Sequence, residues 1–297
     1  MSAAQRSTAA DHRSKLLWVF ALTSVVLVAE VIGGFVSGSL ALLADAGHMF
    51  TDVAGIALAL FAIGFAARPA DDARTYGFYR LEILAAALNA VLLFGIAGWV
   101  LFEAWRRLSE PPEIQGGLML AVALLGAAAN AVSMRVLHPV QGQSLNMRGA
   151  YLEVLGDLLG SVAVLVAALV IRLTGWELAD PIASVIIGLL IVPRTWQLLR
   201  DSANVLLEAT PKGVELVEVR RHIVHTEGVA DVHDLHAWTI TSGMPVLSAH
   251  VVLAEGADGP AVLDRLAACL SDDFDIEHCT FQLETSDRRQ TEETHHP

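Results

Sequence analysis

Residues 40–66 read LALLADAGHMFTDVAGIALALFAIGFA, an apolar run that carries His48 and Asp52 four positions apart. A membrane-spanning helix needs about 20 predominantly apolar residues, so this run is long enough to cross a bilayer. An ionisable side chain inside the bilayer is costly, on the order of 3 kcal/mol for an aspartate, and such groups are functional candidates. The run therefore predicts a transmembrane helix whose polar residues serve a function.

Five further apolar runs complete a set of six predicted spans. They cover residues 16–37, 81–108, 117–137, 150–173 and 180–198. The first run follows Arg13 and Lys15, is longer than the core of a signal peptide and has no evident cleavage site, so we expect it to be retained as a helix. The sequence thus predicts a short N-terminal tail (1–15) and an α-helical, six-span membrane domain (16–200).

Basic residues near the span ends predict the orientation of the domain. Ten lie on the side that holds the N-terminus, the second and fourth connections and the exit of the last span: Arg6, Arg13, Lys15, Arg68, Arg74, Arg80, Arg135, Arg148, Arg194 and Arg200. Three lie on the other side: Arg106, Arg107 and Arg172. Lysine and arginine accumulate on the cytoplasmic side, so both termini are predicted to be cytoplasmic, in an inner (plasma) membrane.

The composition changes after the last span, where charged residues become frequent. Residues 214–226 and 261–270 have helical spacing, and residues 229–240, 246–254 and 279–283 have the pattern of strands. The order αββαβ predicts a small α+β domain of ferredoxin-like type over residues 208–286, with one antiparallel sheet covered on one face by helices. The acidic end, 287–297, is predicted to be a disordered tail.

Charge and cysteine usage exclude several classes of protein. The net charge of −13 argues against a nucleic-acid partner, which would require a basic surface. The two cysteines, Cys269 and Cys279, are too few for a disulfide framework and form no CxxC motif, which fits a reducing compartment. No motif indicates an organic cofactor.

The fifth predicted span carries a second polar pair, Glu153 and Asp157, with the same spacing as His48 and Asp52. Side chains four residues apart lie on one face of a helix, one turn from each other. Two such faces turned toward each other would offer one imidazole and three carboxylates, which suits a tetrahedral Zn²⁺ and also other first-row divalent ions. Asp45, three residues before His48, would either line the path of the ion through the membrane or support the ligands.

Structural roles are predicted for four glycines and for the remaining polar residues of the spans. Gly33, Gly34, Gly156 and Gly160 are predicted to let helices approach closely. Polar contacts between helices or at the membrane interface are expected of five residues: Glu30, Glu82, Asn89, Asn130 and Asp180.

Several motifs resemble the cation diffusion facilitator family, and within it the bacterial zinc-exporting branch. They are residues 39–52 (SLALLADAGHMFTD), 76–82 (YGFYRLE), 154–161 (VLGDLLGS), Asp180-Pro181 and 232–238 (VHDLHAW). The resemblance covers roughly residues 15–285. It implies proton-coupled export of divalent metal ions from the cytoplasm by a homodimer with paired cytoplasmic domains. It also implies that His48, Asp52 and Asp157 form the transport site.

One residue departs from the family pattern. Zinc transporters of this family usually have histidine where this chain has Glu153, so a hard oxygen replaces a nitrogen donor. That change can shift preference from Zn²⁺ toward Co²⁺, Fe²⁺ or Mn²⁺, and Cd²⁺ is a further candidate substrate. Zinc remains the first expectation, and the additional carboxylate can carry a proton.

The resemblance also implies a cytoplasmic metal site. It would draw on His233, His250 and His278, together with Glu284. His236 has the opposite strand parity to His233, so both cannot face one site in a regular strand. His222 and His225, on the first helix of this domain, are predicted to be solvated.

Three other functions remain open from the sequence. An intramembrane metalloenzyme would need a general base beside the metal, and the chain has no HExxH motif. A passive metal channel would show flux that is insensitive to pH gradients. A metal sensor or scaffold, carried by the soluble domain alone, would leave the intramembrane acids unexplained. We therefore expect a transporter and no enzymatic activity.

Overall fold

The computed structural model describes the backbone of residues 3–66, 71–140 and 145–291. Side chains are described within these ranges except at 3–17, 52, 55–66, 140, 145–150 and 289–291. The chain forms two compact units. One comprises Met1–Leu58 with Leu88–Leu199, and the other comprises Ala59–Ala87 with Arg200–Pro297.

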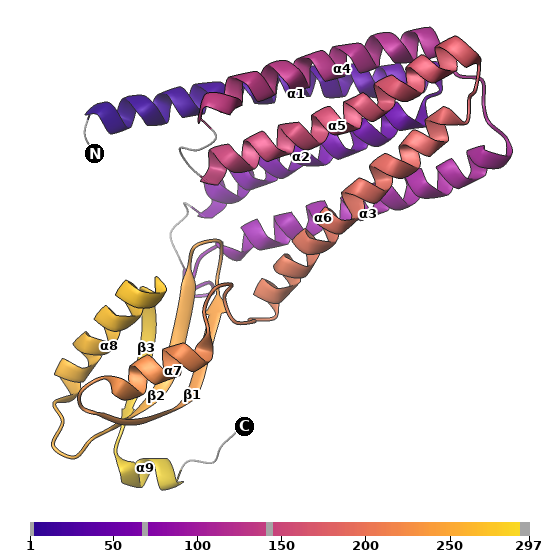
Figure 1. Cartoon of the computed structure of the whole chain (residues 1–297). Helices are drawn as coiled ribbons and strands as arrows, with labels where there is room; N and C mark the ends of the chain where they lie inside the picture. Colours follow the sequence, from indigo (N-terminus) through magenta and orange to yellow (C-terminus); the bar gives the residue numbers. More distant parts are fainter. Residues whose placement is uncertain (1–2, 67–70, 141–144, 292–297) are drawn as a thin grey trace. The chain divides into compact units, whose positions relative to one another are not determined.

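Six long helices account for the predicted spans (Figure 1). They are α1 (Ala3–Ser37), α2 (Leu40–Ala66), α3 (Arg80–Ser109), α4 (Gly116–Leu137), α5 (Leu145–Thr174) and α6 (Ala179–Leu206), with a 3₁₀ turn η1 (His138–Val140) after α4. Among the described residues five of these helices, all but α2, are long and apolar enough to cross a membrane. Much of α2 has no described side chains, and this helix corresponds to the predicted span 40–66. The predicted six-helix fold is confirmed.

Small residues allow these helices to pack closely. A Cβ added to Gly33 on α1 would lie 2.7 Å from Val122 of α4, and one added to Gly34 would lie 2.7 Å from Leu43 of α2. Only a residue without a side chain fits such contacts. Both close approaches were predicted. Around them, buried apolar residues of α2–α6 form one continuous core that includes Leu40, Val100 and Met119.

A buried carboxylate from α6 holds the start of α2. Asp180 accepts hydrogen bonds from the Ser39 hydroxyl at 2.6 Å and from the amides of Leu40 and Ala41 at 2.8 and 3.1 Å. The first amides of a helix have no partner within the helix, and the positive end of the helix dipole favours a negative charge there. Arg107 approaches Asp180 at 3.7 Å. The predicted interhelical role of Asp180 is confirmed.

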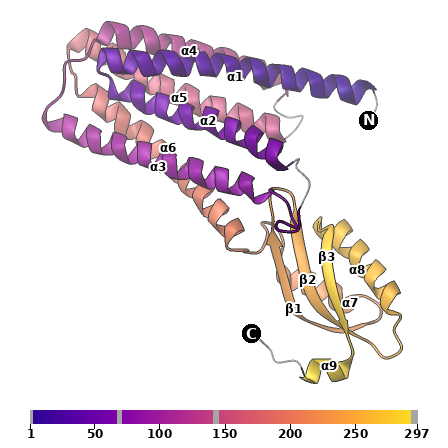
Figure 2. The same ribbon diagram turned by 180° about the vertical axis from the view of Figure 1, so that it is seen from behind.

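The C-terminal part of the chain forms a three-stranded sheet with helices on one face, as Figures 1 and 2 show from opposite sides. Its elements are α7 (Leu216–His225), β1 (Val229–Thr239), β2 (Pro245–Leu253), α8 (Gly259–Phe274), β3 (His278–Glu284) and α9 (Ser286–Thr291). Apolar residues of α7 and α8 pack on the sheet, among them Ile223, Leu266 and Leu270. The predicted αββαβ order is confirmed.

Two details differ from the sequence-based expectation. The sheet is mixed, because β1 and β2 are antiparallel whereas β2 and β3 are parallel. The connection from β2 to β3 runs through α8, and a helical crossover returns the chain in the same direction. In addition, residues 286–291 form the short helix α9 where a disordered tail was predicted. Residues 292–297 of that tail lie outside the described residues.

We predict that Asp180→Ala destabilises the membrane domain by about 2–4 kcal/mol, because three buried donors lose their acceptor. Asp180→Asn should cost less, since its amide oxygen can still accept. The thermal unfolding midpoint of the detergent-solubilised protein measures both effects. Glu110→Ala, at an exposed position after α3, is the matched control, and an Asp180→Ala midpoint equal to that control would contradict the capping role.

Candidate metal sites

An imidazole and a carboxylate face each other between α2 and α5. His48 Nε2 lies 3.6 Å from Asp157 Oδ1, and the two side chains are 12% and 4% exposed. Neither residue is near the other in the sequence. The packing of the two helices therefore brings together one member of each polar pair, as the sequence predicted.

The other members of the pairs lie one helical turn away. α2 and α5 run in opposite directions (Figure 1), so the turn that follows His48 on α2 is level with the turn that precedes Asp157 on α5. Asp52 and Glu153 occupy these two turns. The side chain of Asp52 lies outside the described residues, and its predicted role as a ligand stays a prediction.

Glu153 has a partner that the sequence did not suggest. Its Oε2 forms an ion pair and hydrogen bond with Nη2 of Arg194, which is on α6. The carboxylate is thus directed to α6 and its charge is compensated there. The sequence offered no signal for this contact, because 41 residues separate the partners.

A buried polar network continues from the His48–Asp157 pair. Asp45 is 2% exposed, and its Oδ2 accepts a hydrogen bond from Ser161 on α5 at 3.2 Å. Asn130 of α4 in turn donates to the Ser161 hydroxyl at 3.1 Å. The interhelical role predicted for Asn130 is confirmed. Asp45 supports the helix pair through Ser161, which favours the supporting role over a place on the path.

Glu30, on α1, is a candidate functional residue that the sequence analysis treated only as a structural one. The residue is completely buried, and within the described part of the chain neither carboxylate oxygen has a hydrogen-bond partner. A polar contact between helices or at the membrane interface was expected of it. Buried ionisable groups without such partners are expensive, so their presence indicates a function.

The cytoplasmic domain holds a second cluster, made of His233 on β1, His250 on β2 and Glu284 on β3. His233 and His250 are paired across the antiparallel strands, with ring centroids 5.1 Å apart. Glu284 is buried and joins them, with 3.1 Å from Oε2 to His233 Nε2 and 3.0 Å from Oε1 to His250 Nδ1. One ligand atom from each residue lies within 4.8 Å of the others. Three of the four cytoplasmic residues expected from the resemblance are thus brought together.

His278, the fourth, is not part of this cluster. It begins β3, whereas Glu284 ends it. Six residues along a strand span about 20 Å, so a single chain cannot bring both to one ion.

A bulge in β1 adds Asp234 and His236 to the edge of the cluster. The register shifts between His233 and His236, and Asp234 has a φ of 48°. Its carboxylate reaches His236 at 3.0 Å and His250 at 3.7 Å. The parity argument assumed a regular strand, which this segment is not.

Comparison with known proteins identifies the family. The profile described as the cation efflux transmembrane domain matches residues 16–207, and the profile of the cation efflux protein cytoplasmic domain matches residues 211–286. The chain belongs to the cation efflux family. The resemblance to cation diffusion facilitators is thereby confirmed, and the protein is a multi-pass membrane transporter of metal cations, not an enzyme.

Curated relatives align over nearly the whole cation efflux chain. The metal cation efflux system protein CzcD of Cupriavidus metallidurans is 51% identical over 93% of this chain and 88% of its own. The zinc transporter ZitB of Escherichia coli is 43% identical over 92% and 88%. A cadmium, cobalt and zinc/H(+)-K(+) antiporter of Bacillus velezensis is 38% identical over 93% and 90%. A solved metal-bound C-terminal domain of the Cupriavidus CzcD is 44% identical, covering 24% of this chain and 99% of that one, with a TM-score of 0.23.

We predict that Gly160→Ala impairs the membrane site. A Cβ at this position on α5 would lie 2.7 Å from Asp45 Oδ1, so the carboxylate must move and lose its bond to Ser161. The expected cost is about 1–2 kcal/mol of stability, accompanied by slower metal uptake into reconstituted vesicles.

Gly156→Ala, one turn earlier on α5, is the matched control. No heavy atom lies within 4 Å of a Cβ added there, so the close approach predicted for Gly156 is wrong. This variant should match or exceed the stability of the native protein, since alanine favours helix. Equal behaviour of the two variants would show that the contact between Gly160 and Asp45 has no importance.

Proposed function

We propose that this protein exports divalent transition-metal ions from the cytoplasm in exchange for protons, with Zn²⁺ as the main substrate and Co²⁺, Cd²⁺, Fe²⁺ and Mn²⁺ as further candidates. The observation that carries the proposal is the approach of His48 and Asp157 to 3.6 Å across α2 and α5. The relatives support the substrate class, since they include a zinc transporter and a cadmium, cobalt and zinc antiporter.

The spacing of the two donors suits a metal ion. Nitrogen and oxygen ligands about 2.0–2.1 Å from a tetrahedral Zn²⁺ lie about 3.3 Å from each other. His48 Nε2 and Asp157 Oδ1 are within a few tenths of an ångström of that separation. With Asp52 on the next turn of α2, they supply three ligands of the site that we propose.

The electrostatics of the site favour a cation. Asp45, Asp157 and Glu30 are all buried in the helical unit, and the neutral hydroxyl of Ser161 donates a hydrogen bond to Asp45. The guanidinium of Arg194 is engaged by Glu153. A doubly charged ion between α2 and α5 would offset the charge of the buried Asp157 carboxylate.

Protons complete the proposed cycle. Metal ligands must be deprotonated, so an ion entering from the cytoplasm displaces protons from His48 and the carboxylates, and protons on the far side displace the ion. Glu30, buried without a hydrogen-bond donor among the described residues, is the carboxyl group that we propose as an additional proton carrier. The alternating exposure of the site requires the helices to move relative to each other.

We propose a supporting role for Glu153. Its carboxylate is engaged by Arg194, so Glu153 would bind the ion only after that pair opens. The Glu153 carboxylate would then add a hard oxygen ligand to the site and widen the range of metals that it accepts.

For the cytoplasmic domain we propose a metal site at His233, His250 and Glu284 and assembly into a homodimer. Two nitrogens and a carboxylate form a ligand set that suits Zn²⁺. The second matching profile, ZT_dimer, describes the cytoplasmic domain of this family and supports the dimer. We place both termini in the cytoplasm from the distribution of basic residues. We propose the inner (plasma) membrane as the location because the chain has several apolar spans and bacterial transporter relatives.

We predict that vesicles containing the protein take up Zn²⁺ faster when an opposing pH gradient is imposed, and that Asp157→Ala reduces uptake at least about tenfold because the ion loses a ligand. Radioactive or fluorescent metal assays measure the rate. Glu110→Gln, which changes an exposed carboxylate outside the site, should behave as the native protein. Uptake that ignores the pH gradient would indicate a passive channel, and full uptake by Asp157→Ala would remove this residue from the site.

A second prediction concerns metal preference. Glu153→His replaces an oxygen donor with a nitrogen donor, so we expect the ratio of Zn²⁺ to Mn²⁺ uptake to rise about tenfold in competition assays. Glu153→His both breaks the ion pair with Arg194 and changes the donor atom. Arg194→Gln separates these two effects, because it breaks the ion pair and keeps the Glu153 carboxylate. An unchanged ratio in Glu153→His would show that this residue has no influence on selectivity.

A further inference from the structure

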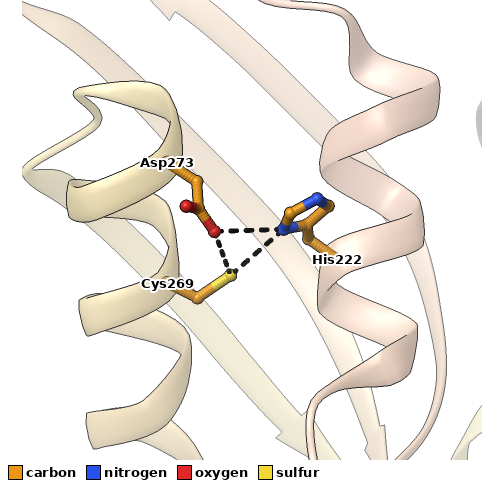
Figure 3. A group of neighbouring side chains, drawn as sticks. All are labelled: His222, Cys269 and Asp273. Carbon is orange, nitrogen blue, oxygen red and sulfur yellow. Dashed lines mark hydrogen bonds and ion pairs between the residues drawn. The ribbon is translucent and has the colours of Figure 1, made fainter.

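Three potential metal ligands converge between α7 and α8, outside both sites described above (Figure 3). His222 Nδ1 lies 3.7 Å from Cys269 Sγ and 3.2 Å from Asp273 Oδ2. The thiol and the carboxylate are 3.7 Å apart. His222 was predicted to be merely solvated, and the structure corrects this.

The fold fixes the positions of all three side chains. Cys269 and Asp273 are four residues apart on α8 and therefore share one helical face. The neighbours Ile223 on α7 and Leu270 on α8 are both completely buried in the core beneath. The imidazole of His222 packs edge-on against the ring of Phe274, with centroids 5.0 Å apart, which orients Nδ1.

The separations match those of a tetrahedral ion. With Zn–S at about 2.3 Å and Zn–N and Zn–O at about 2.0–2.1 Å, the ligand atoms would be about 3.5 Å apart for each sulfur pair and about 3.3 Å apart for nitrogen and oxygen. The observed 3.7, 3.7 and 3.2 Å differ from these values by about 0.2 Å or less. A single ion can be bound without rearrangement of the backbone.

The cluster of His222, Cys269 and Asp273 lies in negatively charged surroundings. Burial, followed by the nearby Asp273 and Asp272, raises the pKa of the Cys269 thiol. A metal ion supplies the positive charge that would favour the thiolate. Arg221, which lines the same depression, is paired with Glu218.

An opening leads from solvent to the cluster. His222 and Cys269 line an open depression of about 410 Å³, together with Arg221, His225 and Thr226. Neither His222 nor Asp273 is buried. The fourth position of a tetrahedral ion would therefore face solvent and can be taken by water.

We propose that His222, Cys269 and Asp273 form a binding site for one borderline divalent ion, Zn²⁺ or Co²⁺, in each chain. The thiolate distinguishes this site from the cluster of His233, His250 and Glu284, which offers nitrogen and oxygen only, and favours Zn²⁺ and Co²⁺ over Mn²⁺ and Mg²⁺. A bound ion links α7 to α8. The site would thus stabilise the helical layer of the cytoplasmic domain when metal is present.

The test uses Co²⁺ and the full-length protein in detergent. A thiolate bound to Co²⁺ gives a charge-transfer absorption band, which ligands containing only nitrogen and oxygen cannot produce. The chain has two cysteines, so the band reports on one of two residues. Cys279 is the matched control, because burial raises its pKa to about 11 and its thiol is directed to the carbonyl of Ile276 at 3.4 Å.

We expect a charge-transfer band that saturates at one Co²⁺ per chain and is removed by Zn²⁺ competition. Cys269→Ser should abolish the band and His222→Ala should weaken Co²⁺ binding at least about tenfold, whereas Cys279→Ala should retain the band. Absence of the band in the native protein, its persistence in Cys269→Ser or its loss in Cys279→Ala would overturn the proposal. Vesicle uptake measured on the same preparations tests the transport function independently of this band.

Discussion

A carboxylate inside a bilayer has to be compensated, and this constraint explains how the membrane helices are arranged. Asp180 receives three hydrogen bonds at the start of α2, and Glu153 receives the guanidinium of Arg194. Asp157 faces the imidazole of His48. Hydrogen-bond donors and a guanidinium compensate the first two charges, whereas the partner of Asp157 is an imidazole, which is itself a possible metal ligand. These three acids therefore differ in the kind of partner that each one meets.

The cytoplasmic domain presents two ligand clusters that are built in different ways. His233, His250 and Glu284 come from three neighbouring strands, so the hydrogen-bonded register of the sheet sets their spacing. His222, Cys269 and Asp273 come from two helices, so their spacing depends on side-chain packing in the core. The helices cover one face of the sheet, and the alternation of side chains places the strand cluster on the other. A small domain with a single core thus positions both sets.

The sequence was sufficient to predict those structural features that follow from a local pattern of residues. Six apolar runs, the αββαβ order and the pairs at i and i+4 follow from periodicity alone, and the structure has all of them. Contacts between distant residues were not accessible in this way. Arg194 reaches Glu153 from another helix, and Asp234 occupies a bulge that no composition signal marks. His222 is 47 residues from Cys269, so only the packing of α7 on α8 shows that they meet.

The junction formed by Asp180 also has a mechanical meaning. Three short hydrogen bonds tie the first turn of α6 to the first turn of α2, and α2 carries His48. Sliding one helix along the other would break all three bonds at once, whereas tilting about this end would preserve them. The junction would therefore act as a hinge point for any tilting of α2, and the displacement of α2 residues would grow with distance from Asp180. His48 and Asp52 lie two to three turns further along α2 and would move more than its first turn in such a tilt.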